Sequence, residues 1–559
     1  MTTTTGGQAL AANLIGHGIE DLFLIPGIQL DWAVDALRQR AGEIRLYVPR
    51  HEQATTYMAD GYYRASGRVG AAMVVPGPGA LNTGAGLATA YASNSKVLFV
   101  TPQIHSQGVG KGYGLLHEIK DQTGFVAGLT KWNAVVPCAE RIAATMDLAF
   151  AQLDHGRPRP VGVEVPHDFL QASIEQQAGA GGQAAPQAVP AVDDALLHAA
   201  AALIDAAAFP VIYAGGGVNN PAGAAGLRAL AEKIGAPVVA SDNGRGALGD
   251  RHPLSMNSLA GRAVFQHADL ILVVGSRFID AMTPTASWPT APGLRYVYLN
   301  IDPADVTPPR MPDVALIGDA ARELPRLAER LRSRTVLKEA DALAVKRWAQ
   351  DQIDAIAPQS QYVKALREAM PDDAIFVNEL TQVGYLARIA FPVYAPHTYI
   401  GPGYQGTLGY GFPVALGAAV GGGGRRVVSI TGDGGFGWNL QELATARRYD
   451  LPVTLVVFND GHYGNVRAIQ RRAFGAEVAV ELSNPDFRLL AQAFGVPFER
   501  VETPEALGAA VRQSMEAGGP VMIEVKIGVV PSPWHLLRLQ PMPGMTGPAA
   551  PANPLDGVL

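Results

Sequence analysis

The sequence predicts an α/β fold made of three doubly wound domains, each with a parallel sheet covered by helices on both faces. The chain has 559 residues, and a domain usually holds about 100–200, so about three domains are expected. Short apolar runs rich in β-branched residues alternate with longer helical patterns along most of the chain. Runs of this kind are typical of strands buried on both faces of a parallel sheet.

Changes in composition divide the chain into these domains. A segment rich in Ala, Gln, Gly and Pro over about 171–192 is predicted to be a linker. A charged helical pattern over about 321–356 is expected to lead from the second domain to the third. The expected division is 1–170, 193–335 and 360–533, with a connecting helix or linker over 336–359 and a tail over 534–559.

Four buried strands are expected in each domain. In chain order they are 21–27, 70–77, 96–103 and 160–166, then 210–217, 237–242, 270–278 and 295–302, then 374–379, 426–434, 453–460 and 520–528. Ligands of open parallel sheets bind beyond the carboxyl ends of the strands. Glycines and polar residues directly after these runs are therefore candidate site residues.

Composition excludes several classes of protein. With 48% apolar and 17% charged residues and a net charge of −6, the chain is neither disordered nor a basic nucleic-acid binder. The single cysteine, Cys138, excludes an intramolecular disulfide, a Cys-rich zinc site and an iron–sulfur cluster. No stretch reaches the ~18 apolar residues of a membrane span, and the N-terminal segment lacks the features of a signal peptide. We therefore expect a cytoplasmic protein.

Two carboxylates follow neighbouring predicted strands of the third domain. Asp433 lies in the glycine-rich turn 432–435, and Asp460 comes directly after the next strand. Both are expected at the same edge of the sheet, where carboxylate oxygens can hold Mg²⁺. The N–H groups of such a turn suit a phosphate. The pattern predicts a Mg²⁺ and diphosphate site, and the alternative is a turn and helix cap without a ligand.

Three groups of motifs make the chain resemble thiamine-diphosphate-dependent enzymes of the acetolactate synthase, pyruvate oxidase, benzoylformate decarboxylase, benzaldehyde lyase and oxalyl-CoA decarboxylase type. They are RHEQ at 50–53 with the segments 58–62 and 76–82, GTLGYGFP at 406–413, and TGDGG at 431–435 with Asn459 and Asp460. The resemblance covers nearly the whole chain. It implies a pyrimidine-binding first domain, a middle domain, and a third domain that binds diphosphate and Mg²⁺.

The resemblance implies a role for the third-domain motifs. Asp433, Asp460 and the backbone carbonyl of His462 would hold Mg²⁺, and the amides of Gly434 and Gly435 would face the diphosphate. Members of the family usually have Asn where this chain has Asp460.

The resemblance also implies how the aminopyrimidine is held and activated. Glu52 would bond N1′ and promote loss of the C2 proton, which gives the ylid. Pro78 and Asn82 would line the pyrimidine pocket. Leu408 would prop the cofactor in its bent shape, and the Gly406 carbonyl would accept from the 4′-amino group. Thr381 and Gln382, in a segment similar to one of benzoylformate decarboxylase, would also touch the cofactor.

The substrate positions depart from those of acetolactate synthases. Ala281 stands in place of an Arg, Asn465 in place of a Met, and Ile469 in place of a Trp. A substrate pocket is expected from Ile28, Gln29, Gln405, Asn465 and Ile469.

Three further residues are candidate catalytic groups: Gln29, His117 and Glu118. A His117–Glu118 pair could transfer protons during addition and release, and the alternative for His117 is a polar loop residue.

The resulting hypothesis is a C–C bond lyase or carboligase that acts on 2-oxo acids, acyloins or aldehydes through a C2 ylid and an enamine. One alternative is an acetolactate synthase-like enzyme with flavin in the middle domain, where a glycine-rich turn lies at 215–217. FAD is possible there, although a vacant middle domain is favoured. The other alternative is a non-catalytic cofactor-binding subunit.

The resemblance also implies an assembly. Glu52 and the metal site of one active centre would come from different subunits, so we expect a homodimer or homotetramer with active sites at the dimer interface. The expected partners are a small carbonyl substrate and a second copy of the chain, with no nucleic acid and no membrane.

Overall fold

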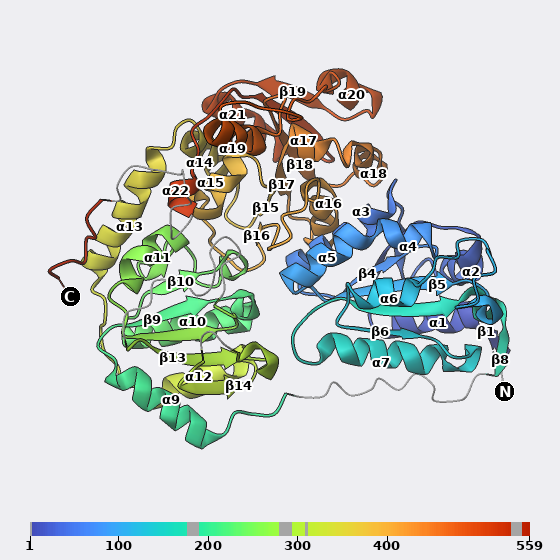
Figure 1. Cartoon of the computed structure of the whole chain (residues 1–559), viewed down its shortest axis with the longest axis horizontal. Coiled ribbons are helices and arrows are strands. Elements are labelled where there is room, and N and C mark those ends of the chain that lie inside the picture. The colour runs from blue at the N-terminus through green and yellow to red at the C-terminus, as the bar shows by residue number, and fades with distance from the viewer. Residues whose placement is uncertain (1–2, 176–188, 279–292, 308–310, 538–550, 559) are drawn as a thin grey trace.

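The computed structural model describes residues 3–175, 189–278, 293–307, 311–537 and 551–558. Within them the chain forms three six-stranded sheets in which every neighbouring pair of strands is parallel, with helices on both faces (Figure 1). The predicted fold class is thereby confirmed. No helix among the described residues is both long enough and apolar enough to cross a bilayer.

The first sheet has the strand order β3-β2-β4-β5-β7-β6. A two-stranded antiparallel pair, β1 (Thr3–Thr5) with β8 (Ser173–Glu175), extends this domain into the segment predicted to be a linker; residues 176–188 of that segment lie outside the described part. The other elements are β2 (Asp21–Leu24), β3 (Arg45–Tyr47), β4 (Gly70–Met73), β5 (Val97–Gln103), β6 (Trp132–Val135), β7 (Val161–Pro166), α1 (Gly6–Gly16), α2 (Asp31–Gln39), α3 (Glu52–Ser66), α4 (Pro78–Asn82), α5 (Gly84–Ser93), α6 (Gln122–Ala127), α7 (Ile142–Asp154) and α8 (His167–Gln171).

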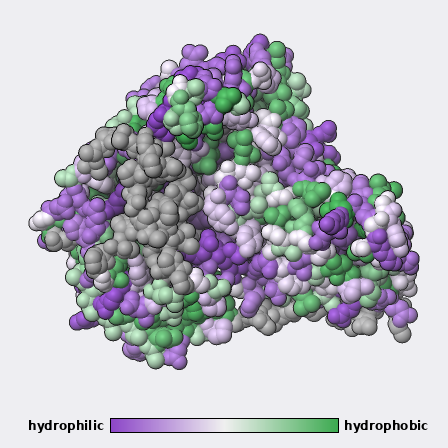
Figure 2. All heavy atoms as spheres, in the orientation of Figure 1, coloured by the Kyte–Doolittle hydropathy of each residue, from purple (hydrophilic) through white to green (hydrophobic). Residues whose placement is uncertain are grey.

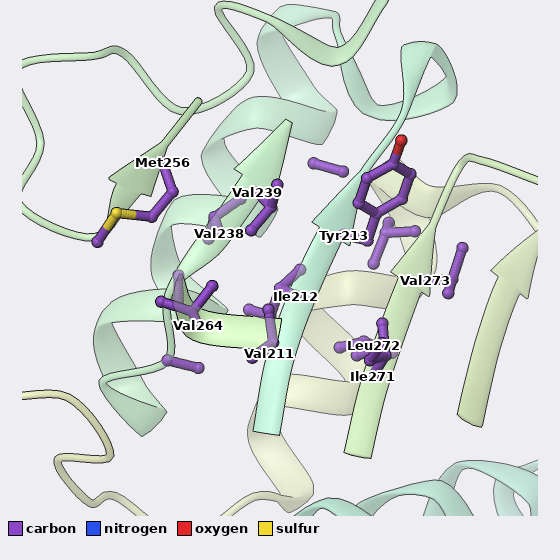
Figure 3. Close-up of a cluster of buried hydrophobic side chains, with 14 of the residues drawn as sticks. Val211, Ile212, Tyr213, Val238, Val239, Met256, Val264, Ile271, Leu272 and Val273 are labelled. Atoms are coloured by element: carbon purple, nitrogen blue, oxygen red, sulfur yellow. The ribbon is translucent and has the colours of Figure 1, made fainter. Parts of the chain in front are cut away.

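The middle sheet has the order β11-β10-β9-β12-β13-β14. Figure 3 shows its core, where Val211, Ile212 and Tyr213 of β9 lie between Val238 and Val239 of β10 and the Ile271, Leu272 and Val273 run of β12. From β9 the chain first adds β10 and β11 on one side and then returns to add β12, β13 and β14 on the other side. A topological switch point therefore lies between β9 and β12. The elements are β9 (Pro210–Ala214), β10 (Val238–Ala240), β11 (Ser255–Met256), β12 (Leu270–Val274), β13 (Arg295–Asn300), β14 (Val314–Ile317), α9 (Asp194–Ala206), α10 (Pro221–Ile234), α11 (Ser258–Phe265) and α12 (Ala320–Arg330).

The third sheet has the order β16-β15-β17-β18-β20-β19, which repeats the topology of the first. Its elements are β15 (Ile375–Asn378), β16 (Tyr399–Ile400), β17 (Val427–Gly432), β18 (Val453–Asn459), β19 (Phe498–Val501), β20 (Val521–Lys526), α14 (Gln359–Ala369), α15 (Gln382–Ala390), α16 (Gly411–Gly421), α17 (Asp433–Phe436), α18 (Leu443–Arg448), α19 (Gly464–Phe474), α20 (Phe487–Ala493), α21 (Pro504–Ser514) and α22 (Trp534–Leu537).

The charged pattern over 321–356 forms two helices rather than one. Between α12 and α13 (Glu339–Asp354) the chain runs beside the end of α10, where the N–H groups of Val336 and Leu337 donate to the carbonyls of Ile234 and Gly235. These two N–H groups thus bond the end of α10 instead of carbonyls four residues earlier in a continuous helix. The apolar face of α13 packs in the core of the middle domain.

Helices α3 and α16 cross closely and join the first and third domains. A Cβ atom on Gly61 would lie 2.0 Å from the Val414 carbonyl oxygen, and one on Gly417 would lie 1.9 Å from that of Met58. Only glycine at these two positions allows the two helix backbones to lie this close together. The crossing fixes the direction of α3, whose first residue is Glu52.

Candidate active site

The two carboxylates of the third domain lie at the carboxyl ends of adjacent parallel strands. Asp433 begins α17 directly after β17, and Asp460 follows β18. The Gly461 N–H donates to Asp433 Oδ2 over 3.0 Å, so the two loops are in contact. Asn484 Nδ2 donates to the same oxygen over 2.6 Å.

The electrostatics of this pair favour a cation. Burial is the largest cause that raises the pKa of each carboxyl, Asp433 and Asp460. The negative charge of Asp433 raises the pKa of Asp460 further. A divalent cation would relieve this repulsion, and its preferred ligands are oxygens. Across the described ranges no cluster of three or more His, Cys, Asp or Glu side chains suits a metal. These residues therefore fit a site completed by backbone and ligand oxygens, as for Mg²⁺ on a diphosphate.

His462 lies in the loop that carries Asp460. Its N–H donates to Asp460 Oδ1 over 3.0 Å, and its ring nitrogen Nδ1 lies 2.7 Å from the Asp460 carbonyl oxygen. The ring is thereby turned onto its own loop, which leaves the backbone as the part of His462 suited to a metal.

The glycine-rich turn brings bare backbone to the same edge. A Cβ atom on Gly434 would lie 2.8 Å from the Tyr463 ring, and one on Gly435 would lie 2.1 Å from Glu379 Oε1. A larger residue at either position would have to displace one of these side chains, so glycine suits the turn, and its bare backbone also suits close approach of a diphosphate to the amides.

Glu52 is the first residue of α3, and its side chain is 21% exposed. Asn82, at the end of α4, donates from Nδ2 to Glu52 Oε2 over 3.0 Å. Pro78 begins the same helix. The structure thus brings together three residues that the sequence predicts around the pyrimidine.

The turn before α4 is held by a buried network. The Gly77 N–H donates to Gln122 Oε1 over 2.7 Å, and Gln122 Nε2 donates to Glu164 Oε2 over 3.0 Å. Gly77 has a φ of 59°, and a Cβ atom there would lie 2.1 Å from the His117 carbonyl oxygen. The His117 loop therefore lies directly against the turn that carries Pro78.

His117 and Glu118 do not form a side-chain pair. His117 has a φ of 68°, and its Nδ1 lies 2.7 Å from Gln29 Oε1, while Gln29 Nε2 donates to the Leu116 carbonyl over 3.0 Å. Glu118 instead accepts from the Leu115 N–H over 2.9 Å, which holds the pKa of its carboxyl below the usual range. The structure thus joins His117 to Gln29.

The turn before α16 presents Leu408 to solvent. Gly406 and Gly409 have φ values of 57° and 82°, and Leu408 between them is 38% exposed. Gln405, just before the turn, is also exposed. Thr381 caps α15 by accepting from the Gly384 N–H over 2.9 Å.

The substrate positions of the third domain adjoin the C-terminal helix. Asn465 Nδ2 donates to the Tyr385 hydroxyl over 3.3 Å, and its Oδ1 accepts from Trp534 Nε1 over 2.8 Å. The Tyr385 and Trp534 rings are 4.9 Å apart. A Cβ atom on Gly464 would lie 2.5 Å from Gln382 Nε2 and 2.3 Å from Asp460 Oδ2. Gly464, the residue before Asn465, therefore lies close to both Gln382 and Asp460, so Asn465 and Gln382 adjoin the loop that carries Asp460.

Ile28 and Ile469 are exposed, at the start of a 3₁₀ turn in the first domain and on α19 in the third.

Five residues that make contacts at the site have no role predicted from the sequence: Gln53 and Glu379, which lie inside the quoted motifs and strand runs, and Tyr385, Asn439 and Asn484. Glu379 carried a usable signal, since it lies directly after a buried strand. The other four act through contacts between segments far apart in the chain, which no local pattern encodes.

The middle domain borders a cavity of about 1340 Å³. It lies at the switch point beside Gly217 and Gly275, where the Gly217 N–H donates to the Gly275 carbonyl over 3.0 Å. All three domains contribute arginines to its wall, which includes Arg64, Arg157, Arg262, Arg277 and Arg388. Ala281, one of the positions that separates this chain from acetolactate synthases, lies outside the described residues.

Comparisons with known proteins show the family of the chain. Models of thiamine pyrophosphate enzymes match at 4–125 (N-terminal TPP binding domain), 197–327 (central domain) and 381–525 (C-terminal TPP binding domain). A probable 2-ketoarginine decarboxylase of Pseudomonas aeruginosa is 33% identical over 94% of each chain. A probable acetolactate synthase large subunit of Methanocaldococcus jannaschii is 32% identical over 93% of this chain and 92% of its own. Isozyme 3 of the acetolactate synthase large subunit of Escherichia coli is 29% identical over 92% and 93%. The chain belongs to the thiamine pyrophosphate enzyme family and is a thiamine-diphosphate-dependent enzyme of the lyase and transferase type.

Proposed function

We propose that the protein is a Mg²⁺-dependent 2-oxo acid decarboxylase that also ligates or cleaves acyloins and aldehydes. The observation that carries the proposal is Asn465. This residue replaces the Met of acetolactate synthases and is bonded to Tyr385 and Trp534, so the pocket beside the metal loop differs from theirs. The similarity to a probable 2-ketoarginine decarboxylase supports the same reading.

Each part of the site has a task in this reaction. When bound, thiamine diphosphate supplies a carbon nucleophile that adds to the substrate carbonyl and then accepts the electrons released with CO₂. Asp433, Asp460 and the His462 carbonyl would hold the Mg²⁺ that neutralises the diphosphate. Glu52, oriented by Asn82, would exchange a proton at the aminopyrimidine.

The first domain would supply the groups that act on the substrate. His117 is oriented by Gln29, whose amide is itself tied to the Leu116 carbonyl. An oriented imidazole can hold or deliver a proton at the substrate oxygen, whereas Glu118 is engaged by its own turn. We therefore assign proton transfer to His117 with Gln29, and to Glu118 only a role in shaping the loop.

Two copies of the chain are proposed to form the active sites between them. Ile28, Leu81 and Leu116 are exposed by 69%, 46% and 63% beside the Glu52 and His117 loops, and Figure 2 shows hydrophobic atoms gathered over the region of α4. Val466 and Phe474 on α19 are also exposed. Pairing of two copies would cover these apolar surfaces. We propose a homodimer or a dimer of dimers, located in the cytoplasm.

The proposal is tested by supplying the purified protein with thiamine diphosphate, Mg²⁺ and a panel of 2-oxo acids, and by measuring CO₂ and product masses. We expect CO₂ release that depends on both additions and is lost in Glu52→Gln. The matched control is Glu20→Gln, a surface residue paired with Arg68 over 2.6 Å, which should retain wild-type turnover. Acetolactate as the main product from pyruvate would contradict the proposal.

A second candidate is an acetolactate synthase-like enzyme with flavin in the middle domain. The cavity at the switch point favours it, because its position and the five arginines in its wall suit a dinucleotide phosphate. A yellow protein whose flavin is released on denaturation, together with acetolactate formation, would support this candidate. A colourless protein that decarboxylates other 2-oxo acids would exclude it.

The remaining alternative from the sequence, a non-catalytic cofactor-binding subunit, disagrees with the comparisons, which show a thiamine-diphosphate-dependent enzyme. The retention of Glu52 and of both carboxylates in contacting loops argues against it, since binding alone does not require the glutamate.

A further inference from the structure

Glu379 is a buried acid that the proposed mechanism does not use. It follows β15 and is 2% exposed. Its Oε1 accepts from the Gly409 N–H over 2.7 Å, and its Oε2 accepts from the Gly411 N–H over 3.0 Å. Both oxygens thus bond the backbone that carries Leu408. The groups that favour its ionised form are neutral donors, these two amides and the Thr431 hydroxyl.

Asn439 holds the other side of the same residue. Its Nδ2 donates to the Gly409 carbonyl over 2.6 Å, and it is 1% exposed. Gly409 therefore has both its backbone N–H and its carbonyl bonded by buried side chains from two different segments. Its φ of 82° lies in the left-handed region, which is one of several conformations open to glycine, so the two hydrogen bonds select this conformation from among them.

We propose that Glu379 and Asn439 are positioning residues that fix the Leu408 turn by binding Gly409 from both sides. The inference rests on the proposed role of Leu408 as the residue that props the cofactor. Glu379 suits the task because a carboxylate offers two acceptors to two N–H donors. Glutamine would direct an NH₂ group at one of these donors and lose a hydrogen bond.

The same contacts connect the turn to the start of α3 in the same chain, whose Glu52 would serve the other active site of the proposed dimer. Asn439 Oδ1 accepts from Gln53 Nε2 over 2.9 Å, and Gln53 is the residue after Glu52. A hydrogen-bonded series therefore runs from Glu379 through Gly409 and Asn439 to α3. A change at Asn439 should disturb both the turn and the start of α3, whereas a change at Glu379 should disturb mainly the turn.

The test is amide hydrogen exchange of residues 405–412 in the protein without cofactor, in wild type, Glu379→Gln and Asn439→Ala. Loss of one buried hydrogen bond should speed exchange of these amides about tenfold in Glu379→Gln. Asn439→Ala should also speed exchange of residues 50–54. The matched control is Glu323→Gln, a fully buried glutamate of the middle domain, which should leave 405–412 unchanged.

A second readout is the affinity for thiamine diphosphate with Mg²⁺, which should fall about tenfold in Glu379→Gln. Unchanged exchange of 405–412 in folded Glu379→Gln and Asn439→Ala would overturn the inference. Faster exchange with wild-type affinity and turnover would support the inference and contradict the proposed role of Leu408. The two failures are therefore distinguishable. If one variant does not fold, the other still decides the question.

Discussion

Asn82 donates a hydrogen bond from Nδ2 to Oε2 of Glu52 over 3.0 Å, and this bond joins the end of α4 to the start of α3. One oxygen of the glutamate is thereby fixed, and the other is left for a ligand. The position of the Glu52 carboxylate thus depends on a residue from a different motif.

Replacement of Asn82 by Leu should therefore impair Glu52 without removing it. We expect kcat to fall about tenfold, because the loss of a hydrogen bond to a charged group corresponds to about 1.5–3 kcal/mol when that group is buried and to less when it is partly exposed. Steady-state kinetics at saturating cofactor measures the effect. Wild-type kcat in Asn82→Leu would show that the bond has no part in catalysis.

The metal site predicts a difference between its two acids. Asp433→Ala should abolish Mg²⁺-dependent cofactor binding, whereas Asp460→Asn keeps an oxygen ligand and should weaken Mg²⁺ binding only about tenfold. Thermal unfolding with and without Mg²⁺ and thiamine diphosphate measures both. At ligand concentrations about 100-fold above Kd the wild type should gain about 2.7 kcal/mol. An equal gain in Asp433→Ala would place the metal elsewhere.

Glu379 predicts a pH dependence of stability. Burial raises its pKa to about 7, above the ordinary value of 4.5, so the folded state holds the proton over a range in which the unfolded chain releases it. Protonated Glu379 therefore adds to the free energy of unfolding. This added stability is fully present below about pH 4.5 and is lost as pH rises through about 7, and it amounts to about 3 kcal/mol. Its bonded neighbours, the Gly409 and Gly411 amides and the Thr431 hydroxyl, do not titrate there.

Denaturant unfolding of wild type and Glu379→Gln between pH 4.5 and 8 measures this contribution. The free energy of unfolding of wild type, relative to that of Glu379→Gln, should fall as pH rises from 4.5 to 8, because glutamine cannot bind the proton. A difference that stays constant over the range would contradict the assignment.

Trp534 predicts that the C-terminal helix affects the substrate pocket. Trp534→Phe removes the bond to Asn465 Oδ1 and retains an aromatic ring beside Tyr385. We expect kcat/KM for the 2-oxo acid to fall about tenfold, the effect of losing one buried hydrogen bond. Trp348→Phe, which loses a bond to the Pro551 carbonyl, is the control and should behave as wild type. Equal effects of the two substitutions would indicate a general loss of stability.

The sequence predicted the central strands of the sheets and missed their edges. In each domain the four expected strands occupy the middle of the sheet, while β3 and β6, β11 and β14, and β16 and β19 are its two edges. The reason is physical. Central strands are buried on both faces and read as continuous apolar runs, whereas β11 and β16 have two residues each and cannot produce a pattern.

The site shows the same division. Asp433, Asp460 and Glu379 are signalled by their place directly after buried strands, because a parallel sheet brings the carboxyl ends of its strands to one edge. The contact of Gln53 with Asn439 depends on how two domains pack, and no local pattern encodes it. Adjacency in sequence was also misleading at His117, whose positive φ separates its side chain from that of Glu118.

The central claim is that Glu52 activates the cofactor. Its most direct test is the rate of hydrogen–deuterium exchange at C2 of thiamine diphosphate bound to wild type and to Glu52→Gln, with cofactor binding checked separately. General acid–base groups contribute about 10²–10⁴-fold, so exchange in the variant should be at least about 100-fold slower while the cofactor remains bound. Equal exchange rates in the two proteins would contradict the account.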